Sequence, residues 1–419
     1  MEGVAADGVA RVVLRIPAAE ANEPFMLTLL NDSGNASLSV DEDGGLTLPG
    51  EDRSGAANTL FVSAQETPAG PTAFAVYHSP IDFPRPDGRD AAAGERTVAI
   101  RVQSLDSSGN PLDVPVKIVR PPVFLVHGIW SNPGAWAFFR PLVPDLSQRF
   151  FVATISYQET NDQGFEANAL VVLPRAQELL NQFKSLKNVA AVQYDAVTHS
   201  MGGNIIRALV LSGQFVQDGN YARGDVHKLI TIGTPHLGTQ FANRLLHSSA
   251  FCQSVFAGLE MPVADGVRDM AVGSAALSAI NQTTVHGLLT HTVVGIANSE
   301  QVAAAQSGFA ASVGRRVCPS LFPPGGSTGV LGEPSDLIVA VRSQSAQGLV
   351  LLGGDPPSSS FAPIIHAVDP KLFRLGPDEL SRIVEGGQRT FAPTGIPERV
   401  IDLLNRNLSD ATDFKAIRP

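Results

Sequence analysis

The sequence is short of cysteine and of positive charge, and it has no long apolar run. Two cysteines among 419 residues exclude a cysteine-rich zinc site and leave room for one disulfide bond. The 40 acidic and 30 basic residues give a net charge of -10, which argues against nucleic-acid binding, because that function needs a basic surface. No apolar stretch approaches the ~18 residues of a transmembrane helix. The first residues, Met1 to Val4, also lack the pattern of a signal peptide.

What is abundant is apolar sequence. Hydrophobic residues make up 44% of the chain and charged residues 17%, which is enough for a large core and excludes global disorder. A length of 419 residues is long for one domain and comfortable for two.

The first part of the chain alternates short apolar runs with turn residues. The runs are 12–16, 25–29, 60–62, 73–77 and 97–102, separated by Asn-, Asp- and Gly-rich segments. Short alternating strands at this spacing predict an all-β sandwich domain, immunoglobulin-like, over residues 1–119. The acidic segment 41–44 lacks the other ligands of a calcium loop, so we interpret it as a hairpin turn.

The pattern changes after a proline-containing linker at 119–122. Residues 123–126 form a continuous apolar run, typical of a parallel strand that is buried on both faces. Further strands are expected at 151–155 and 228–233, with a helix over about 168–186 between them. Such alternation predicts a doubly wound, mostly parallel α/β domain over residues 120–419.

One serine stands at the junction of a predicted strand and a predicted helix. β-forming and small residues precede Ser200, and apolar residues at helical spacing follow Gly203. A sharp turn of this kind is a nucleophile elbow, which exposes the serine Oγ at the end of the sheet. Gly202 provides the small residue that the close crossing of strand and helix needs. Thr198 stands where the commonest form of this motif has glycine, so the sequence is a Thr-x-Ser-x-Gly variant.

Three ordered motifs together resemble bacterial lipases and esterases of the α/β-hydrolase superfamily. They are Val126-His127-Gly128, the segment from Thr198 to Gly203, and the segment from Gly233 to Thr239 with the sequence Gly-Thr-Pro-His-Leu-Gly-Thr. The resemblance covers the chain from about Pro121 onward. It implies the α/β-hydrolase fold and a catalytic triad in the order nucleophile, acid, histidine.

The resemblance assigns the acid to Asp336 and the base to His366. Asp336 stands beside a Val-rich segment followed by serines, as the acid of the family does, while Asp355 and Asp369 remain rivals. His366 is the histidine that follows Asp336 and matches the family's histidine loop. Ser200 would attack an ester carbonyl while His366 takes its proton.

The same resemblance places the oxyanion hole at two backbone N–H groups. One belongs to Met201, directly after the nucleophile, and the other to Ile129, after His127-Gly128. No metal and no organic cofactor is expected for this chemistry.

A lid or cap is expected as an insertion at about 240–330. Its apolar residues are interpreted as a lid or as the wall of an acyl pocket, with Phe251, Val255, Phe256 and Leu259 on one helical face. These residues are Phe241, Leu245, Phe251, Val255, Phe256 and Leu259.

The leading hypothesis is a secreted serine carboxylic-ester hydrolase that cleaves hydrophobic esters through an acyl-enzyme, with a lipid or polymer surface as a candidate partner. Polyester degradation, acyl transfer and amide hydrolysis on the same triad are alternatives. A surface-binding protein with an inert hydrolase domain is the alternative from another class. In an extracellular hydrolase we expect Cys252 and Cys318 to form a disulfide bond.

Overall fold

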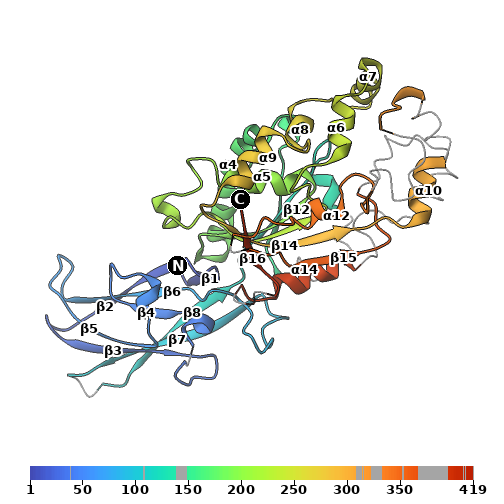
Figure 1. Cartoon of the computed structure of the whole chain (residues 1–419). Coiled ribbons are helices and arrows are strands. Elements are labelled where there is room, and N and C mark those ends of the chain that lie inside the picture. The colour runs from blue at the N-terminus through green and yellow to red at the C-terminus, as the bar shows by residue number, and fades with distance from the viewer. Residues whose placement is uncertain are drawn as a thin grey trace.

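The computed structural model describes the chain except residues 38, 107–108, 138–148, 308–313, 315, 322–332, 352, 367–394, 409, 411 and 419. It is a mixed α/β structure. Antiparallel strands of the N-terminal part gather at one end of the molecule, and a parallel sheet with its helices lies at the other (Figure 1). No described helix is both long and apolar enough to span a membrane.

A mostly parallel sheet organises the C-terminal part. Its order is β10-β9-β12-β13-β14-β15, these neighbours are all parallel, and β16 pairs antiparallel with β14. The strands are β9 (Val123–Val126), β10 (Val152–Ile155), β12 (Tyr194–His199), β13 (Val226–Ile232), β14 (Leu288–Gly295), β15 (Ser358–Phe361) and β16 (Lys415–Ile417).

Helices bury both faces of this sheet. Alternate residues of β9 point to opposite sides, so Phe124 packs with α4 and α5 while Val123 packs with α14. This two-sided burial explains why β9 is a continuous apolar run. The helices are α4 (Phe165–Lys187), α5 (Met201–Leu209), α6 (Gln240–Leu246), α7 (Ala250–Gly258), α8 (Asp265–Asp269), α9 (Ala275–Gln282), α10 (Ser299–Ser307), α12 (Val341–Gln344) and α14 (Ile396–Leu404).

Two sheets form the N-terminal part. One has the order β11-β1-β8-β7-β3-β5 and the other the order β2-β6-β4, and a single cluster of buried apolar side chains draws on both. The strands are β1 (Gly3–Ala5), β2 (Arg11–Pro17), β3 (Pro24–Leu30), β4 (Gly45–Thr47), β5 (Thr59–Ser63), β6 (Thr72–His78), β7 (Glu95–Ser104), β8 (Leu112–Val119) and β11 (Val189–Ala190). All five runs expected to be strands in this part are strands.

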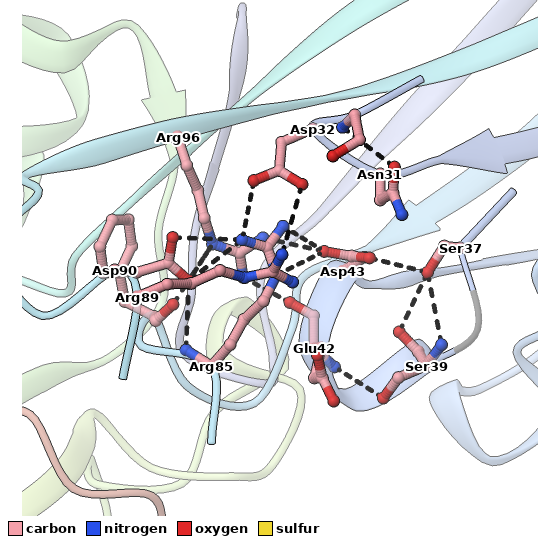
Figure 2. Close-up of polar contacts among 12 residues, drawn as sticks. Asn31, Asp32, Ser37, Ser39, Glu42, Asp43, Arg85, Arg89, Asp90 and Arg96 are labelled. Carbon is pink, nitrogen blue, oxygen red and sulfur yellow. Dashed lines mark hydrogen bonds and ion pairs between the residues drawn. The ribbon is translucent and has the colours of Figure 1, made fainter. Parts of the chain in front are cut away.

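The acidic segment at 41–44 is not a hairpin turn. It belongs to a one-turn helix, α1 (Val40–Asp43), which Ser39 caps. The Asp43 carboxylate turns inward and pairs with the buried Arg85 at 2.7 Å and with Arg96 at 3.1 Å (Figure 2). Asp90 meets Arg85 from the other side at 3.1 Å. The negative charges therefore neutralise buried guanidinium groups, the condition under which such groups are tolerated in a core.

The segment expected to be a linker is buried. The Arg120 guanidinium lies 4.5 Å from the ring centroids of both Phe83 and Phe150, and its Nε donates to the Ala93 carbonyl at 2.7 Å. The N-terminal strand β1 also pairs with β11, which follows α4. The N-terminal sheets and the parallel sheet are thus joined by packing as well as by the chain.

The interval of about 240–330 is not a single insertion, which corrects the expectation. It contains β14, which pairs with β13 and β15 within the parallel sheet. Only the helices from α6 to α9 lie between β13 and β14. This strand was not predicted because three polar residues interrupt its apolar residues. These residues, Thr290, His291 and Thr292, are fully or almost fully buried.

Candidate active site

Ser200 occupies a strained turn between β12 and α5. Its backbone angles are φ 53° and ψ -129°, a conformation that L-residues rarely adopt. Its Oγ stands at the carboxyl end of the parallel strands. A Cβ built on Gly202 would come within 2.6 Å of the His127 carbonyl oxygen, so only glycine fits where helix and strand cross. The local geometry is the strained strand-to-helix turn that the sequence predicted.

The structure brings together the three residues that the sequence selected. Ser200 Oγ lies 2.8 Å from His366 Nε2, and His366 Nδ1 lies 2.7 Å from Asp336 Oδ2. The three residues are 6%, 7% and 1% exposed, respectively. A buried hydroxyl, imidazole and carboxylate that contact one another in this order allow a proton to pass from the serine to the histidine.

Backbone contacts fix the acid and the histidine relative to each other. Asp336 Oδ1 accepts from the N–H groups of Ile338 and Val339 at 3.1 and 2.7 Å. The His366 N–H donates to the Asp336 carbonyl at 2.8 Å. The second carboxylate oxygen is therefore left to face the imidazole.

Asp355, a rival for the acid, is exposed and accepts from the Gly348 N–H instead. Asp369, the second rival, lies outside the described residues.

His199, beside the serine, is a histidine that stays neutral. Burial, followed by the nearby His366, lowers the pKa of His199 to about 3. Its Nε2 lies 3.2 Å from the His366 carbonyl oxygen, to which it donates. A neutral ring next to His366 leaves positive charge free to develop on His366 alone.

The two expected oxyanion donors flank Ser200. Met201 is the first residue of α5, and the loop with Ile129 follows β9. A Cβ on Gly128 would lie 2.8 Å from Ser200 Cβ, so this loop runs directly against the serine. Neither the Met201 nor the Ile129 N–H donates to a protein acceptor among the described residues. Both N–H groups are therefore available to bind an oxygen atom of a ligand.

The predicted lid residues divide by exposure. Leu245 and Phe256 are buried, whereas Phe251 is 64% exposed. The expectation that Phe251 and Phe256 share one helical face is therefore wrong, because the buried face of α7 is formed by Cys252 and Phe256, four residues apart. Val255, Leu259 and Phe241 are half-buried.

Contacts link these helices to the loop beside Ser200. The Phe256 ring lies 6.1 Å from that of Trp130 and 6.3 Å from that of Phe241. The expected disulfide bond between Cys252 and Cys318 is present, with a Cα–Cα distance of 5.0 Å.

Sequence reasoning missed Asn161 and Trp130, which shape the loop that carries Ile129. Asn161 follows β10, the strand next to β9, and its side chain hydrogen-bonds that loop. The available signal was positional, since ligand-binding residues of parallel sheets lie beyond the carboxyl ends of the strands.

Among the described residues, no group of three or more His, Cys, Asp or Glu side chains could hold a metal ion.

Comparisons with known proteins give a partial match to one family model. The model, described as "Domain of unknown function (DUF7379)", matches residues 101–251. No curated protein matches the sequence.

Several solved structures are similar over part of the chain. The mature lipase BlEst2 of Bacillus licheniformis is 19% identical over 54% of this chain and 78% of its own, with a TM-score of 0.37. The phospholipase PlaB of Legionella pneumophila is 12% identical over 70% and 61%, with a TM-score of 0.44. The lipase of Staphylococcus hyicus is 14% identical over 54% and 79%, with a TM-score of 0.33. All three identities are below 20% and all three TM-scores are below 0.5.

Proposed function

We propose that the protein is a serine carboxylic-ester hydrolase that cleaves hydrophobic esters through an acyl-enzyme. The observation that carries the proposal is the chain of contacts from Ser200 Oγ through His366 to Asp336, at 2.8 and 2.7 Å. A serine hydroxyl is a weak nucleophile until a neighbouring base removes its proton, and His366 Nε2 is within reach to do so.

In the proposed mechanism His366 takes the proton as Ser200 attacks the ester carbonyl. Asp336 holds the imidazole and stabilises the imidazolium that forms. The N–H groups of Met201 and Ile129 bind the oxyanion of the tetrahedral intermediate. His366 then protonates the leaving alcohol, and water activated by the same histidine releases the acid.

We further propose that residues 120–419 form an α/β-hydrolase domain and that residues 1–119 form a β-sandwich domain. Parallel strands buried on both faces, with Ser200 at the carboxyl end of β12, support the first assignment. An apolar core shared by two sheets supports the second. Secretion is proposed as well, because disulfide bonds persist mainly in oxidising compartments.

The proposed substrate class follows from the side chains near the oxyanion loop. Phe241, Phe256 and Trp130 form an aromatic group, and helices α6 and α7 carry two of its three members. Apolar walls favour an acyl chain over a charged substrate. We therefore propose that α6 to α9 form the cover of an acyl pocket.

Hydrolysis of p-nitrophenyl esters by the full chain tests the proposal. Wild-type protein should release p-nitrophenol, and the Ser200→Ala variant should do so on the order of 10⁶-fold more slowly, with only oxyanion-hole and binding catalysis left. A wild-type rate equal to that of the variant, across short and long acyl chains, would reject the enzyme and favour the surface-binding alternative.

A further inference from the structure

We infer that Asn161 and His127 are positioning residues, which orient and polarise the Gly128–Ile129 peptide group as an oxyanion donor. The inference rests on the proposed function and extends it to two side chains that do not touch the substrate. Its basis is the number of hydrogen bonds that converge on a single backbone carbonyl.

The Gly128 carbonyl oxygen accepts two side-chain hydrogen bonds. Asn161 Nδ2 donates at 2.9 Å, and His127 Nδ1 donates at 3.0 Å. The C=O and N–H of a trans peptide point in opposite directions. Holding the Gly128 carbonyl on the side of Asn161 therefore turns the Ile129 N–H to the other side.

The protonation state of His127 agrees with this role. Burial lowers the pKa of His127 to about 4, which leaves the ring neutral near neutral pH. Nε2 faces the Tyr157 N–H at 3.5 Å and so acts as the acceptor, which assigns the ring proton to Nδ1. The ring also stacks on Tyr157 at a centroid distance of 4.2 Å, which fixes its orientation.

Asn161 holds the rest of the loop with the same amide. Its Nδ2 also donates to the Ser131 carbonyl at 3.0 Å, and its Oδ1 accepts from the Trp130 N–H at 2.7 Å. Exchanging the amide oxygen and nitrogen would break all three contacts, so the orientation of the side chain is determined. Trp130 has a φ of 54°, which this bond helps to maintain.

Polarisation follows from the two bonds to one carbonyl. Each hydrogen bond to a peptide oxygen strengthens the attached N–H as a donor, by roughly 10–30% in condensed-phase estimates. The Ile129 N–H is thus both aimed and strengthened before substrate arrives. Such preorganised donors act on the transition state more than on the bound ester.

The test compares Asn161→Ala with Asn220→Ala in the full chain. Asn220 is a close match, because it is 5% exposed against 6% for Asn161, donates twice through Nδ2 and accepts one backbone N–H. Both variants should lose thermal stability. Only Asn161→Ala should lose kcat, by on the order of 10²-fold, the effect of removing one oxyanion donor, with KM nearly unchanged.

Two further measurements separate positioning from general damage. Binding of a trifluoromethyl ketone, which forms an oxyanion on Ser200, should weaken in Asn161→Ala in parallel with kcat, while binding of an unreactive ether analogue stays constant. His127→Leu should resemble Asn161→Ala, whereas His127→Asn, which keeps an N–H donor near the Nδ1 position, should recover most of kcat.

The outcomes distinguish the inference from the proposed function. If wild type is active and Ser200→Ala is not, but Asn161→Ala retains the kcat of Asn220→Ala, the positioning role is wrong and the proposed function stands. If wild type neither hydrolyses esters nor binds the ketone, both are wrong.

Discussion

The same parallel sheet carries one histidine–aspartate pair at the carboxyl end of its strands and another at the amino end. At the carboxyl end of the strands His366 Nδ1 lies 2.7 Å from Asp336, and at the amino end His227 Nδ1 lies 2.7 Å from Asp195. The difference is at the other ring nitrogen. His366 Nε2 faces the hydroxyl of Ser200, whereas His227 Nε2 faces the carbonyl of Ile81 at 2.9 Å.

That one contact separates the proposed base, His366, from a histidine that is held in its protonated form. A hydroxyl can donate its proton, but a carbonyl only accepts, so His227 must carry protons on both nitrogens to satisfy both partners. Burial would lower the pKa of His227, but the charge and hydrogen bond of Asp195 outweigh it and raise the pKa. Lys228 pairs with Asp82 beside it at 2.8 Å, which joins the sheet to the N-terminal part. A His–Asp pair is therefore not a catalytic signature until its third partner is known.

Replacing each histidine by alanine gives the largest expected contrast. His366→Ala should lower ester turnover by on the order of 10⁶, because Ser200 loses its base. His227→Ala should keep the turnover of the folded protein and lose stability, since Asp195 is left buried and unpaired. Turnover per folded molecule and thermal melting measure the two effects. Equal losses of turnover in the two variants would contradict the distinction between the two histidine–aspartate pairs.

The aspartates give the next contrast. Asp336→Asn should lower kcat by about 10⁴, because the amide no longer selects the imidazole tautomer that Ser200 needs. Asp195→Asn should leave kcat unchanged and lower the melting temperature. Steady-state kinetics of both variants check this, and near-normal activity of Asp336→Asn would remove Asp336 as the acid.

The disulfide bond sharpens the comparison, because it anchors helix α7 covalently, whereas charged side chains hold the amino end of the sheet. Cys252 and Cys318 are 66 residues apart, for which loop-closure entropy gives roughly 4 kcal/mol of stabilisation. Denaturant unfolding of the Cys252→Ser, Cys318→Ser double variant should show a loss of up to that size. Reductant should lower the stability of wild type to the same level and leave the double variant unchanged.

The smallest expected effect is a pH dependence of stability. The raised pKa of His227 means that its stabilising contribution is complete below ~6.5, the ordinary histidine pKa, and is lost as pH rises through the raised value. The difference in melting temperature between wild type and His227→Gln should therefore shrink as pH rises above ~6.5. A difference that grows with pH would mean that His227 is neutral in the fold.

His127, His199 and His291 should act in the opposite direction. Burial is the main cause that lowers their pKa values, to about 4, 3 and 4. The unfolded chain takes up protons at these positions below ~6.5, so stability is lost as pH falls through that range. Melting of wild type on the acid side measures this loss.

The sequence predicted those elements that show a simple pattern, either a continuous apolar run or a helical period. Residues 123–126 are β9, and the helix expected over 168–186 is α4 with slightly wider bounds. It did not predict β14, whose buried threonines and histidine read as polar. Nor did it predict that α1 turns Asp43 inward, because the pairing guanidinium of Arg85 is 42 residues away.

The residues of the candidate site also fall into those that the sequence predicted and those that only the fold reveals. Ser200, Asp336 and His366 could be selected because order along the chain and local motifs identify them, and their meeting across 166 and 30 residues then follows from the fold. Asn161 carries no motif, and only the register of β10 beside β9 brings its amide to the loop. The contrast between His366 and His227 is likewise invisible in sequence, because it depends on which oxygen faces Nε2.

Labelling with a fluorophosphonate, followed by mass spectrometry of the intact protein and its peptides, tests the central claim most directly. The reagent reacts with a serine that a neighbouring base has activated. We predict one adduct per chain on Ser200, retained in His227→Ala and lost in His366→Ala. An adduct on another residue, no adduct in wild type, or undiminished labelling of Ser200 in His366→Ala would contradict the claim that His366 activates Ser200.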